Sequence, residues 1–385
     1  IGFNTLQLNK NGFLGTFMTQ NSIVAGVRKP RVVADVDTGI DDSLALVYLA
    51  ALHSAGEIDL VVTTSAGNTT AQQAAVNSTE VLRLAGAAEV PVVSGAQAPL
   101  NLPLTTTPET HGEKGLGYYS PGVWAEAVSA DVETVSADVG AAVRSDVRAA
   151  VDAWRGASHL LIAGPATNLA WALEHAPEVV GKGTAVTLMT GAFNYPGNTT
   201  PTAEWNAWVD PHALKQVFGG GAGRGGGRHL PTICPLNVTE QVLLYPDRLH
   251  RWQNVLQPTR PGLAALLGDA LRFYFEFHES VGVGYCAQIH DLAAAMVMLR
   301  RVPCSFYDAT VDVEADSPLM RGTTVADRVV DGGGGSVAAV RRDADPAGAR
   351  GAYWNRPANA RILEALDPAD VFAEFERVVC GFGAD

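Results

Sequence analysis

VVADVDTGIDDSLAL, residues 32–46, is the stretch that decides the fold. It opens with an apolar, β-branched run typical of a buried strand and closes with an apolar pattern typical of a helix. Four carboxylates lie within it, at Asp35, Asp37, Asp41 and Asp42. Carboxylates this close repel and raise one another's pKa, so we expect this strand-to-helix turn to hold a hard divalent cation.

The same alternation continues along the chain. We predict strands at residues 31–34, 58–64, 92–94, 160–163, 185–189 and 232–234, and helices at 42–53, 71–84, 147–154, 166–174 and 211–218. Further helices are expected at 264–278 and 292–300, and a terminal β segment at 310–314 and 325–330. Continuous apolar runs suit strands covered on both faces, as parallel strands are. The sequence therefore predicts an α/β fold, with an open, mostly parallel sheet, helices on both faces and the active site at the carboxyl ends of the strands.

One domain is expected over residues 30–385, preceded by a flexible N-terminal extension at residues 1–29. This extension lacks the basic start and the sustained apolar run of a signal peptide. Met18 would serve as a natural start, which would leave residues 1–17 outside the native protein. Two glycine-rich stretches, 219–228 and 331–336, predict surface loops, because neither has the Gly-Lys-Ser/Thr ending of a phosphate-binding loop.

Composition and charge disfavour several classes of protein. The chain has 27 Lys and Arg against 40 Asp and Glu, a formal net charge of -13, which disfavours nucleic acid and anionic membrane surfaces as partners. No apolar stretch approaches the roughly 18 residues of a membrane-spanning helix. The four cysteines are far apart and form no C-x-x-C pair, which predicts free thiols in a reducing compartment. We therefore expect a soluble, cytoplasmic protein.

Polar residues also follow the other predicted strands. Because the carboxyl ends of parallel strands meet at one edge of a sheet, we expect these residues to lie near the acidic turn. The candidates are Asn68, the segment 163–168, Met189, Asn198, Glu204, Asn206, His290 and Asp291. Their oxygens and amides suit a calcium or magnesium ion beside a polyhydroxylated ligand such as a sugar. No His or Cys cluster has zinc spacing.

Three other interpretations of the acidic turn compete with a metal site. An EF-hand fails, because the twelfth residue from Asp35 is Leu46 and the closing Glu is missing. Capping of the following helix by Asp41 would explain one carboxylate. A haloacid-dehalogenase-type phosphatase would use Asp35 as nucleophile and Asp37 as acid/base, but Gly39 stands where that family shows Thr or Val.

The acidic turn closely resembles the signature of the nucleoside hydrolases, Asp-x-Asp-x-Gly-x-Asp-Asp. The resemblance covers most of the chain from Arg31 to about residue 330. It is carried by further segments in the same order: Gly67-Asn68, 111–117, 164–168, Met189 with Gly191, Gly197-Asn198, 203–206, Asp210-Pro211, His290-Asp291 and 322–327.

This resemblance implies a role for each candidate residue. It implies a Ca²⁺ ion held by Asp37, Asp42, Asp291 and the main-chain carbonyl of Ala163, where the family more usually has Thr. Asp37 would be the general base on a calcium-bound water. Separately from the resemblance, we expect Asp35 to support the turn. The implied ribose contacts are Asp41, Asn68, Met189, Asn198, Glu204 and Asn206. His111 and His290 would lie near the leaving base, with His290 as the acid that protonates it. We expect Trp205 and Trp208, which flank the segment of Glu204 and Asn206, to pack in the core.

The implied reaction is hydrolysis of the N-glycosidic bond of ribonucleosides to free base and ribose, through an oxocarbenium-like transition state. His290 stands where purine-restricted relatives have Trp, which resembles the inosine-uridine-preferring branch, whereas the Glu-Trp-Asn segment 204–206 resembles the purine-restricted branch. We expect a broad or inosine-uridine profile. A homodimer or homotetramer is implied by the family. A catalytically silent protein that binds calcium and ribonucleosides remains an alternative.

Overall fold

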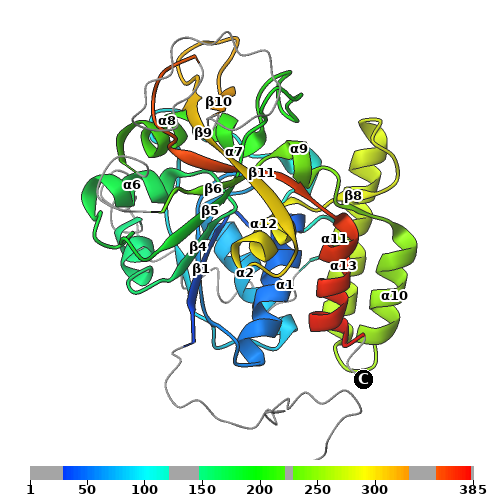
Figure 1. The fold of residues 1–385 in the computed structure, drawn as a ribbon. Coiled ribbons are helices and arrows are strands. Elements are labelled where there is room, and N and C mark those ends of the chain that lie inside the picture. Colours follow the sequence, from blue (N-terminus) through cyan, green and yellow to red (C-terminus); the bar gives the residue numbers. More distant parts are fainter. Residues whose placement is uncertain (1–28, 121–146, 222–228, 329–352, 383–385) are drawn as a thin grey trace, which may run out of the picture.

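A computed structural model of the chain describes residues 29–120, 147–221, 229–328 and 353–382 (Figure 1). The predicted N-terminal extension, with Met18, lies outside these residues, as do most of the 219–228 stretch and all of 331–336. In the described part of the chain, no helix is long and apolar enough to cross a membrane.

One central sheet organises the molecule, and the predicted α/β architecture is confirmed. Six neighbouring strands run parallel in the order β3-β2-β1-β4-β5-β6. Their bounds are β1 (Arg31–Val36), β2 (Asp59–Thr64), β3 (Val92–Ser94), β4 (His159–Ile162), β5 (Ala185–Met189) and β6 (Thr232–Cys234). Because β1 lies in the middle of this order, the acidic turn that follows it opens at the centre of the carboxyl edge.

The last strands extend the sheet in a way that the sequence did not predict. The structure adds β11 (Ala360–Leu366) parallel to β6, and then β9 (Cys304–Val313) and β10 (Thr324–Arg328) antiparallel. The expected strand at 310–314 is therefore longer, and β11 was missed. A separate two-stranded ribbon joins β7 (Leu243–Leu244) to β8 (Ala287–Gln288).

Helices cover both faces of the sheet (Figure 1). On one face lie α1 (Ile40–Ser54), α2 (Ala71–Ala85), α10 (Pro246–Leu256), α11 (Pro261–Ser280), α12 (His290–Met298) and α13 (Pro368–Phe375). On the other lie a helix at 147–153, α6 (Thr167–His175) and α8 (Pro211–Gln216). Short helices α3 (Pro108–His111), α7 (Trp205–Val209) and α9 (Leu236–Thr239) lie in the connections, and π-helical turns end two segments at Val217–Gly221 and Glu376–Cys380.

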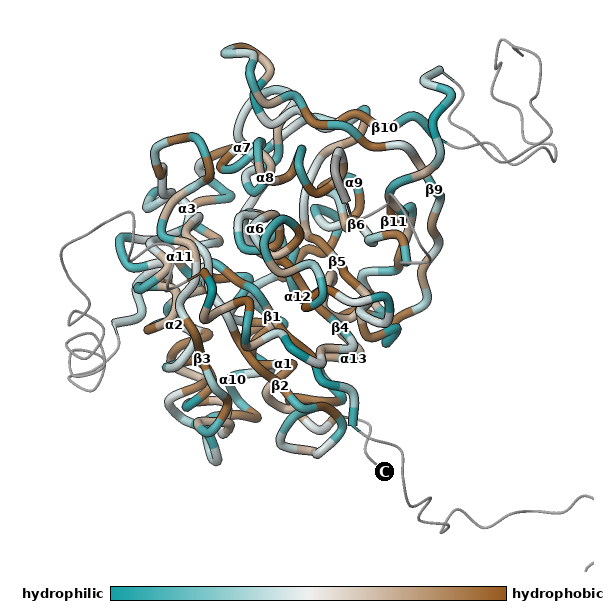
Figure 2. Tube along the Cα trace, turned by 90° about the vertical axis from the view of Figure 1, so that its left-hand side faces the viewer, coloured by the Kyte–Doolittle hydropathy of each residue, from teal (hydrophilic) through white to brown (hydrophobic). Residues whose placement is uncertain are grey.

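The side-chain alternation of β1 divides the interior into two cores. Val32, Ala34 and Val36 pack against α1 and α12, whereas Val33 faces the core of α6 and α8. Hydrophobic residues accordingly concentrate in the sheet and in the helices that touch it (Figure 2). Trp205 and Trp208 belong to neither core, so their expected core packing is wrong. They are half-buried and stack on one another, with ring centroids 5.6 Å apart.

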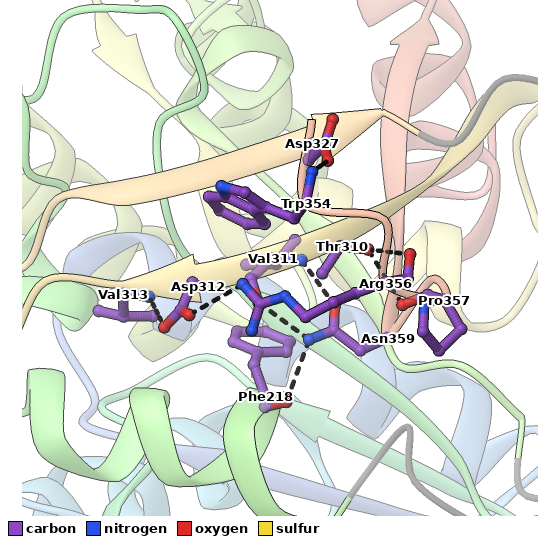
Figure 3. A network of polar contacts seen from close by, with 10 residues as sticks. All are labelled: Phe218, Thr310, Val311, Asp312, Val313, Asp327, Trp354, Arg356, Pro357 and Asn359. Carbon is purple, nitrogen blue, oxygen red and sulfur yellow. Dashed lines mark hydrogen bonds and ion pairs between the residues drawn. The ribbon is translucent and has the colours of Figure 1, made fainter. Parts of the chain in front are cut away.

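A polar network attaches the C-terminal strand to the sheet (Figure 3). The side chain of Asn359 accepts from the Val311 N–H at 2.6 Å and donates to the Val311 and Phe218 carbonyls at 2.8 and 3.0 Å. Pairing between β9 and β11 ends at Ala309 and Ala360, so the Asn359 side chain continues the ladder by one residue. Nearby, the Asp327 carboxylate accepts from the Trp354 N–H at 2.7 Å.

Replacing Asn359 by alanine is expected to lower the free energy of unfolding by about 2 kcal/mol, because the peptide groups of Val311 lose their partners. Urea unfolding followed by circular dichroism measures this difference. Asn101→Ala is the control, since Asn101 is exposed and its side chain makes no hydrogen bond among the described residues. Equal stability of the two variants would contradict the role given to Asn359.

Candidate active site

Two helix N-termini bring buried carboxylates together at the carboxyl edge of the sheet. Asp41 and Asp42 lie in the first turn of α1, and Asp291 lies in the first turn of α12. Each offers one oxygen within 4.8 Å of the other two. The N-terminus of a helix stabilises negative charge, which explains why these carboxylates occupy first turns. The sequence placed Asp41 with the sugar, but the geometry also makes it a neighbour of the predicted metal ligands.

The electrostatics of this group fit a hard cation. Burial, followed by repulsion from Asp42, raises the pKa of Asp41 to about 7, and burial raises the pKa of Asp42 to about 6. Burial and the charges of neighbouring carboxylates also raise the pKa values of Asp37 and Asp291. The buried Oδ1 of Asp42 has no hydrogen-bond partner among the described residues. A divalent cation would compensate this charge with oxygen ligands of the kind that Ca²⁺ prefers.

Asn68 holds Asp37 at the edge of this carboxylate group. The Asn68 N–H donates to Asp37 Oδ2 at 2.7 Å, and its side-chain amide donates to Asp37 Oδ1 at 3.1 Å and to Asp42 Oδ2 at 3.3 Å. A Cβ atom at Gly67 would lie 2.1 Å from Asp37 Oδ2, so only glycine permits this approach. The predicted sugar contact Asn68 therefore also orients the predicted base.

A second amide, that of Asn206, joins the ends of β4 and β5. Its Nδ2 donates to the carbonyl of Ala163 at 2.6 Å and to the carbonyl of Met189 at 3.0 Å. Its Oδ1 is buried without a hydrogen-bond partner among the described residues. The structure thus brings together three predicted residues that are up to 43 positions apart.

Glu204 has a structural task in addition to any contact with a sugar. Its carboxylate caps α7 by accepting from the N–H groups of Asn206 and Ala207, at 2.7 and 3.0 Å. It also accepts from the N–H of Gly191 and the hydroxyl of Thr190. Asn198 lies in the same region but is exposed, and its Oδ1 accepts from the Trp205 N–H at 3.0 Å.

Asp35 faces away from the carboxylate group. Its Oδ1 accepts from the Thr63 hydroxyl at 2.6 Å and from the Asn168 amide at 2.8 Å. Trp154 extends this network by donating from Nε1 to the Thr63 hydroxyl at 2.9 Å. These bonds tie β1 to β2, to α6 and to the helix at 147–153. Burial nevertheless raises the pKa of Asp35 to about 6.

The two predicted histidines are buried and adopt opposite tautomers. Nδ1 of His111 accepts from the N–H of Ile40 at 3.1 Å, so the proton of its neutral ring lies on Nε2. His290 Nδ1 bonds the hydroxyl of Thr239 at 2.9 Å, and this hydroxyl donates to the carbonyl of Pro235. The ring of His290 is therefore the donor in that bond. Burial, followed by the proximity of His278, lowers the pKa of both His111 and His290 to about 3.

Tyr274 and His278 complete the histidine side of the site, and the sequence analysis assigned neither. The ring centroid of Tyr274 lies 5.3 Å from that of His111 and 4.3 Å from that of His278. His278 Nδ1 bonds the carbonyl of Tyr274 at 2.8 Å, and its Nε2 lies 3.2 Å from Oε1 of Gln288. Tyr274 and His278 are four residues apart on a predicted helix, and such residues share a helix face. This spacing was the signal in the sequence that could have paired them.

Comparison with known proteins identifies the family. The model of the family described as inosine-uridine preferring nucleoside hydrolase matches residues 32–373. This chain belongs to that family. It is therefore an enzyme of the nucleoside hydrolase class, as the acidic signature implied.

Two relatives of this nucleoside hydrolase are named for pyrimidine ribonucleosides. A pyrimidine-specific ribonucleoside hydrolase RihA of Shewanella baltica (strain OS185) is 31% identical over 299 residues, or 77% of this chain and 86% of the relative. The protein of the same name from Shewanella woodyi is 32% identical over 322 residues, or 82% and 94%.

Solved structures share the fold. A plant nucleoside hydrolase superposes with a TM-score of 0.68 at 23% identity, covering 92% of this chain and 99% of that chain. A purine-preferring ribonucleoside hydrolase from Gardnerella vaginalis gives a TM-score of 0.68 at 24% identity, covering 91% and 98%. At these identities the likeness shows the fold alone.

His278 is expected to make the nucleoside hydrolase less stable as the pH falls. Burial lowers its pKa below the ordinary 6.5, so the unfolded chain binds the proton first and gains stability below about pH 6.5. His278→Gln should make the slope of the unfolding free energy between pH 7 and 5 shallower, by up to about 1.4 kcal/mol per pH unit. Urea unfolding in excess chelator measures this slope.

The matched control for that measurement is His250→Gln, because His250 is exposed on α10. The unfolding free energy of the His250→Gln variant should have the same slope between pH 7 and 5 as that of the parent protein. An unchanged slope in His278→Gln would show that His278 does not titrate in the way inferred.

Proposed function

We propose that this nucleoside hydrolase cleaves the N-glycosidic bond of ribonucleosides, releasing free base and ribose, with Ca²⁺ as its cofactor. The observation that carries the proposal is the group of buried carboxylates at the carboxyl edge of the sheet, flanked by the amides of Asn68 and Asn206. Carboxylates can bind the cation, and they can also stabilise the positive charge that develops on the ribose.

Asp37, Asp42, Asp291 and the carbonyl of Ala163 are the proposed ligands, and Asp41 is close enough to take part. When bound, Ca²⁺ would polarise a water molecule and lower its pKa. Asp37 would take the proton of the attacking water, because Asn68 fixes its carboxylate and burial raises its pKa toward that of a useful base. Asp42 and Asp291 would remain charged beside the cation.

The ribose would lie among the amide and carboxylate groups that follow the neighbouring strands. These are Asp41, Asn68, Met189, Asn198, Glu204 and Asn206. Oδ1 of Asn206 supports this placement, since it is a buried acceptor that no described residue bonds, and such an acceptor suits a sugar hydroxyl. Glu204 would act mainly by fixing the loop after β5, because four donors already occupy its oxygens.

The leaving base would face His111 and His290. In its neutral tautomer His111 offers an Nε2–H donor to the base. His290 is the proposed acid, although its low pKa keeps it neutral before substrate binds. Nε2 of His290 carries no proton in this tautomer. Negative charge that develops on the departing base would raise the proton affinity of His290, so that Nε2 would take a proton from solvent water and pass it to the base.

A broad or inosine-uridine base preference remains our proposal, and the differing names of the relatives do not narrow it. We also propose that residues 30–385 form one domain that functions in the cytoplasm as a homodimer or homotetramer. The negative charge of the chain agrees with a partner set that includes neither nucleic acid nor membrane.

Asp37→Ala is expected to reduce turnover of inosine and uridine by at least about 10²-fold, because the general base is lost. Release of reducing sugar measures turnover, and thermal unfolding checks the fold. Asp316→Ala is the control, since the side chain of Asp316 is 82% exposed. Unchanged turnover in Asp37→Ala would remove Asp37 as base, and nucleoside binding by the parent protein without any sugar release would favour the silent binding protein.

Removal of Ca²⁺ with a chelator is expected to abolish sugar release and to lower the midpoint of thermal unfolding. The physical reason is that a cation bound only to the folded state stabilises it, by about 2.7 kcal/mol at one hundred times its dissociation constant. Added Ca²⁺ should restore both quantities, and Mg²⁺ and Zn²⁺ serve as comparisons. A midpoint that does not respond to any of these cations would contradict the proposed site.

A further inference from the structure

The loop after β5 is fastened to α9 at the histidine end of the site. The Phe193 N–H donates to Oδ1 of Asn237 at 3.0 Å, and Nδ2 of Asn237 donates back to the Phe193 carbonyl at 2.9 Å. The Leu236 N–H donates to the carbonyl of Gly191 at 2.9 Å. Asn194, the next residue of this loop, has φ of 52°, in the left-handed region. The loop is therefore held in one conformation by the helix.

The loop presents Tyr195 to the end of the same helix. Its hydroxyl donates to Oε2 of Glu240 at 2.9 Å, and Glu240 is the C-cap of α9. Glu240 is half-buried and Tyr195 is 37% exposed. Within the described part of the chain, the other carboxylate oxygen of Glu240 makes no hydrogen bond. The pair thus holds one carboxylate oxygen in place and leaves the other available to a ligand.

Glu240 lies near the residues proposed to receive the base. Its neighbour Thr239 bonds the ring of His290. Glu240 is close enough to Tyr274 for its charge to raise the pKa of that phenol, after burial and the site carboxylates. The Tyr274 ring in turn lies 5.3 Å from that of His111.

We infer that Glu240, oriented by Tyr195, is a specificity-determining residue that contacts the ring N–H of the leaving base. The inference rests on the proposed function. Hypoxanthine, guanine and uracil carry a hydrogen on a ring nitrogen of the pairing edge, whereas adenine and cytosine carry a lone pair there. Nucleosides of the first three bases are therefore the favoured substrates.

The physical reason is that an ionised carboxylate only accepts hydrogen bonds. It attracts a ring N–H and repels the lone pair of a ring nitrogen, and sites that satisfy such a donor discriminate strongly against analogues without it. The hydroxyl of Tyr195 stabilises the ionised form and limits the rotamers of Glu240. Guanine has an amino group beside its ring N–H and offers the carboxylate two donors.

The test compares kcat/KM for inosine with that for adenosine, and for uridine with that for cytidine. Glu240→Gln replaces one acceptor by a donor, so both ratios should fall about tenfold or more from the parent values, with calcium content and thermal unfolding unchanged. Tyr195→Phe should lower the ratios in the same direction by a smaller factor. Glu89→Gln and Tyr353→Phe are the controls, because both side chains are exposed, at 67% and 83%.

The outcomes separate this inference from the function on which it rests. Hydrolysis with ratios that do not change in Glu240→Gln would overturn the inference and leave the proposed function intact. If the parent protein hydrolyses no ribonucleoside, the proposed function fails. Calorimetric affinities for inosine and adenosine then decide the inference on binding alone. A preference for inosine that Glu240→Gln removes would support it, and equal affinities would overturn it.

Discussion

The burial of negative charge at the end of β1 is the constraint on which the rest of the site depends. Asp35, Asp37 and Asp42 are fully buried, and Asp41 is 5% exposed. A buried carboxylate is tolerated only where hydrogen-bond donors or a cation compensate its charge. The chain supplies donors unequally: Asp35 receives Thr63 and Asn168, and Asp37 receives Asn68. Asp42 receives Gly39 and Asn68 on Oδ2, but its Oδ1 has no hydrogen-bond partner among the described residues. This carboxylate lies with those of Asp41 and Asp291, where a cation fits.

The close approach of segments around these carboxylates restricts the backbone at two glycines. A Cβ at Gly67 would overlap Asp37, and a Cβ at Gly39 would lie 2.7 Å from both the Asn68 amide and the His111 ring. Gly39 also precedes α1 and donates its N–H to Asp42 at 2.8 Å. The carboxylates, the amide and the histidine can thus share one small region only because these turns carry no side chain.

Much of the fold could be predicted from local patterns. The strands at 92–94, 185–189 and 232–234 have the predicted bounds, because continuous apolar runs between turn residues are strong strand signals. The strand β11 was missed, since its place between β6 and β9 depends on partners that are more than 40 residues away in the sequence. Asn359, for example, which directly precedes β11, bonds Val311 of β9. Half-buried strands of this kind are specified by tertiary contacts more than by their own residues.

The candidate site shows the same division between local and distant information. The acidic turn and the residues after each strand were apparent from their position in the α/β rhythm. The capping role of Glu204 was not apparent, because it depends on the N–H groups of a short helix and of the β5 loop. Tyr274 was overlooked and His278 was given no role, because their contacts with α3 and β8 are not shown by a single helical pattern.

The opposite tautomers of His111 and His290 explain how one end of the site could both bind and release a base. With its Nδ1 occupied by the N–H of Ile40, His111 can present only an Nε2–H to a ligand. With its Nδ1–H directed at Thr239, His290 presents a free Nε2 lone pair. A neutral base would therefore meet one donor and one acceptor, whereas a base that departs with negative charge would favour a proton on both rings. The hydrogen bonds of the supporting residues, more than the histidines themselves, set this polarity.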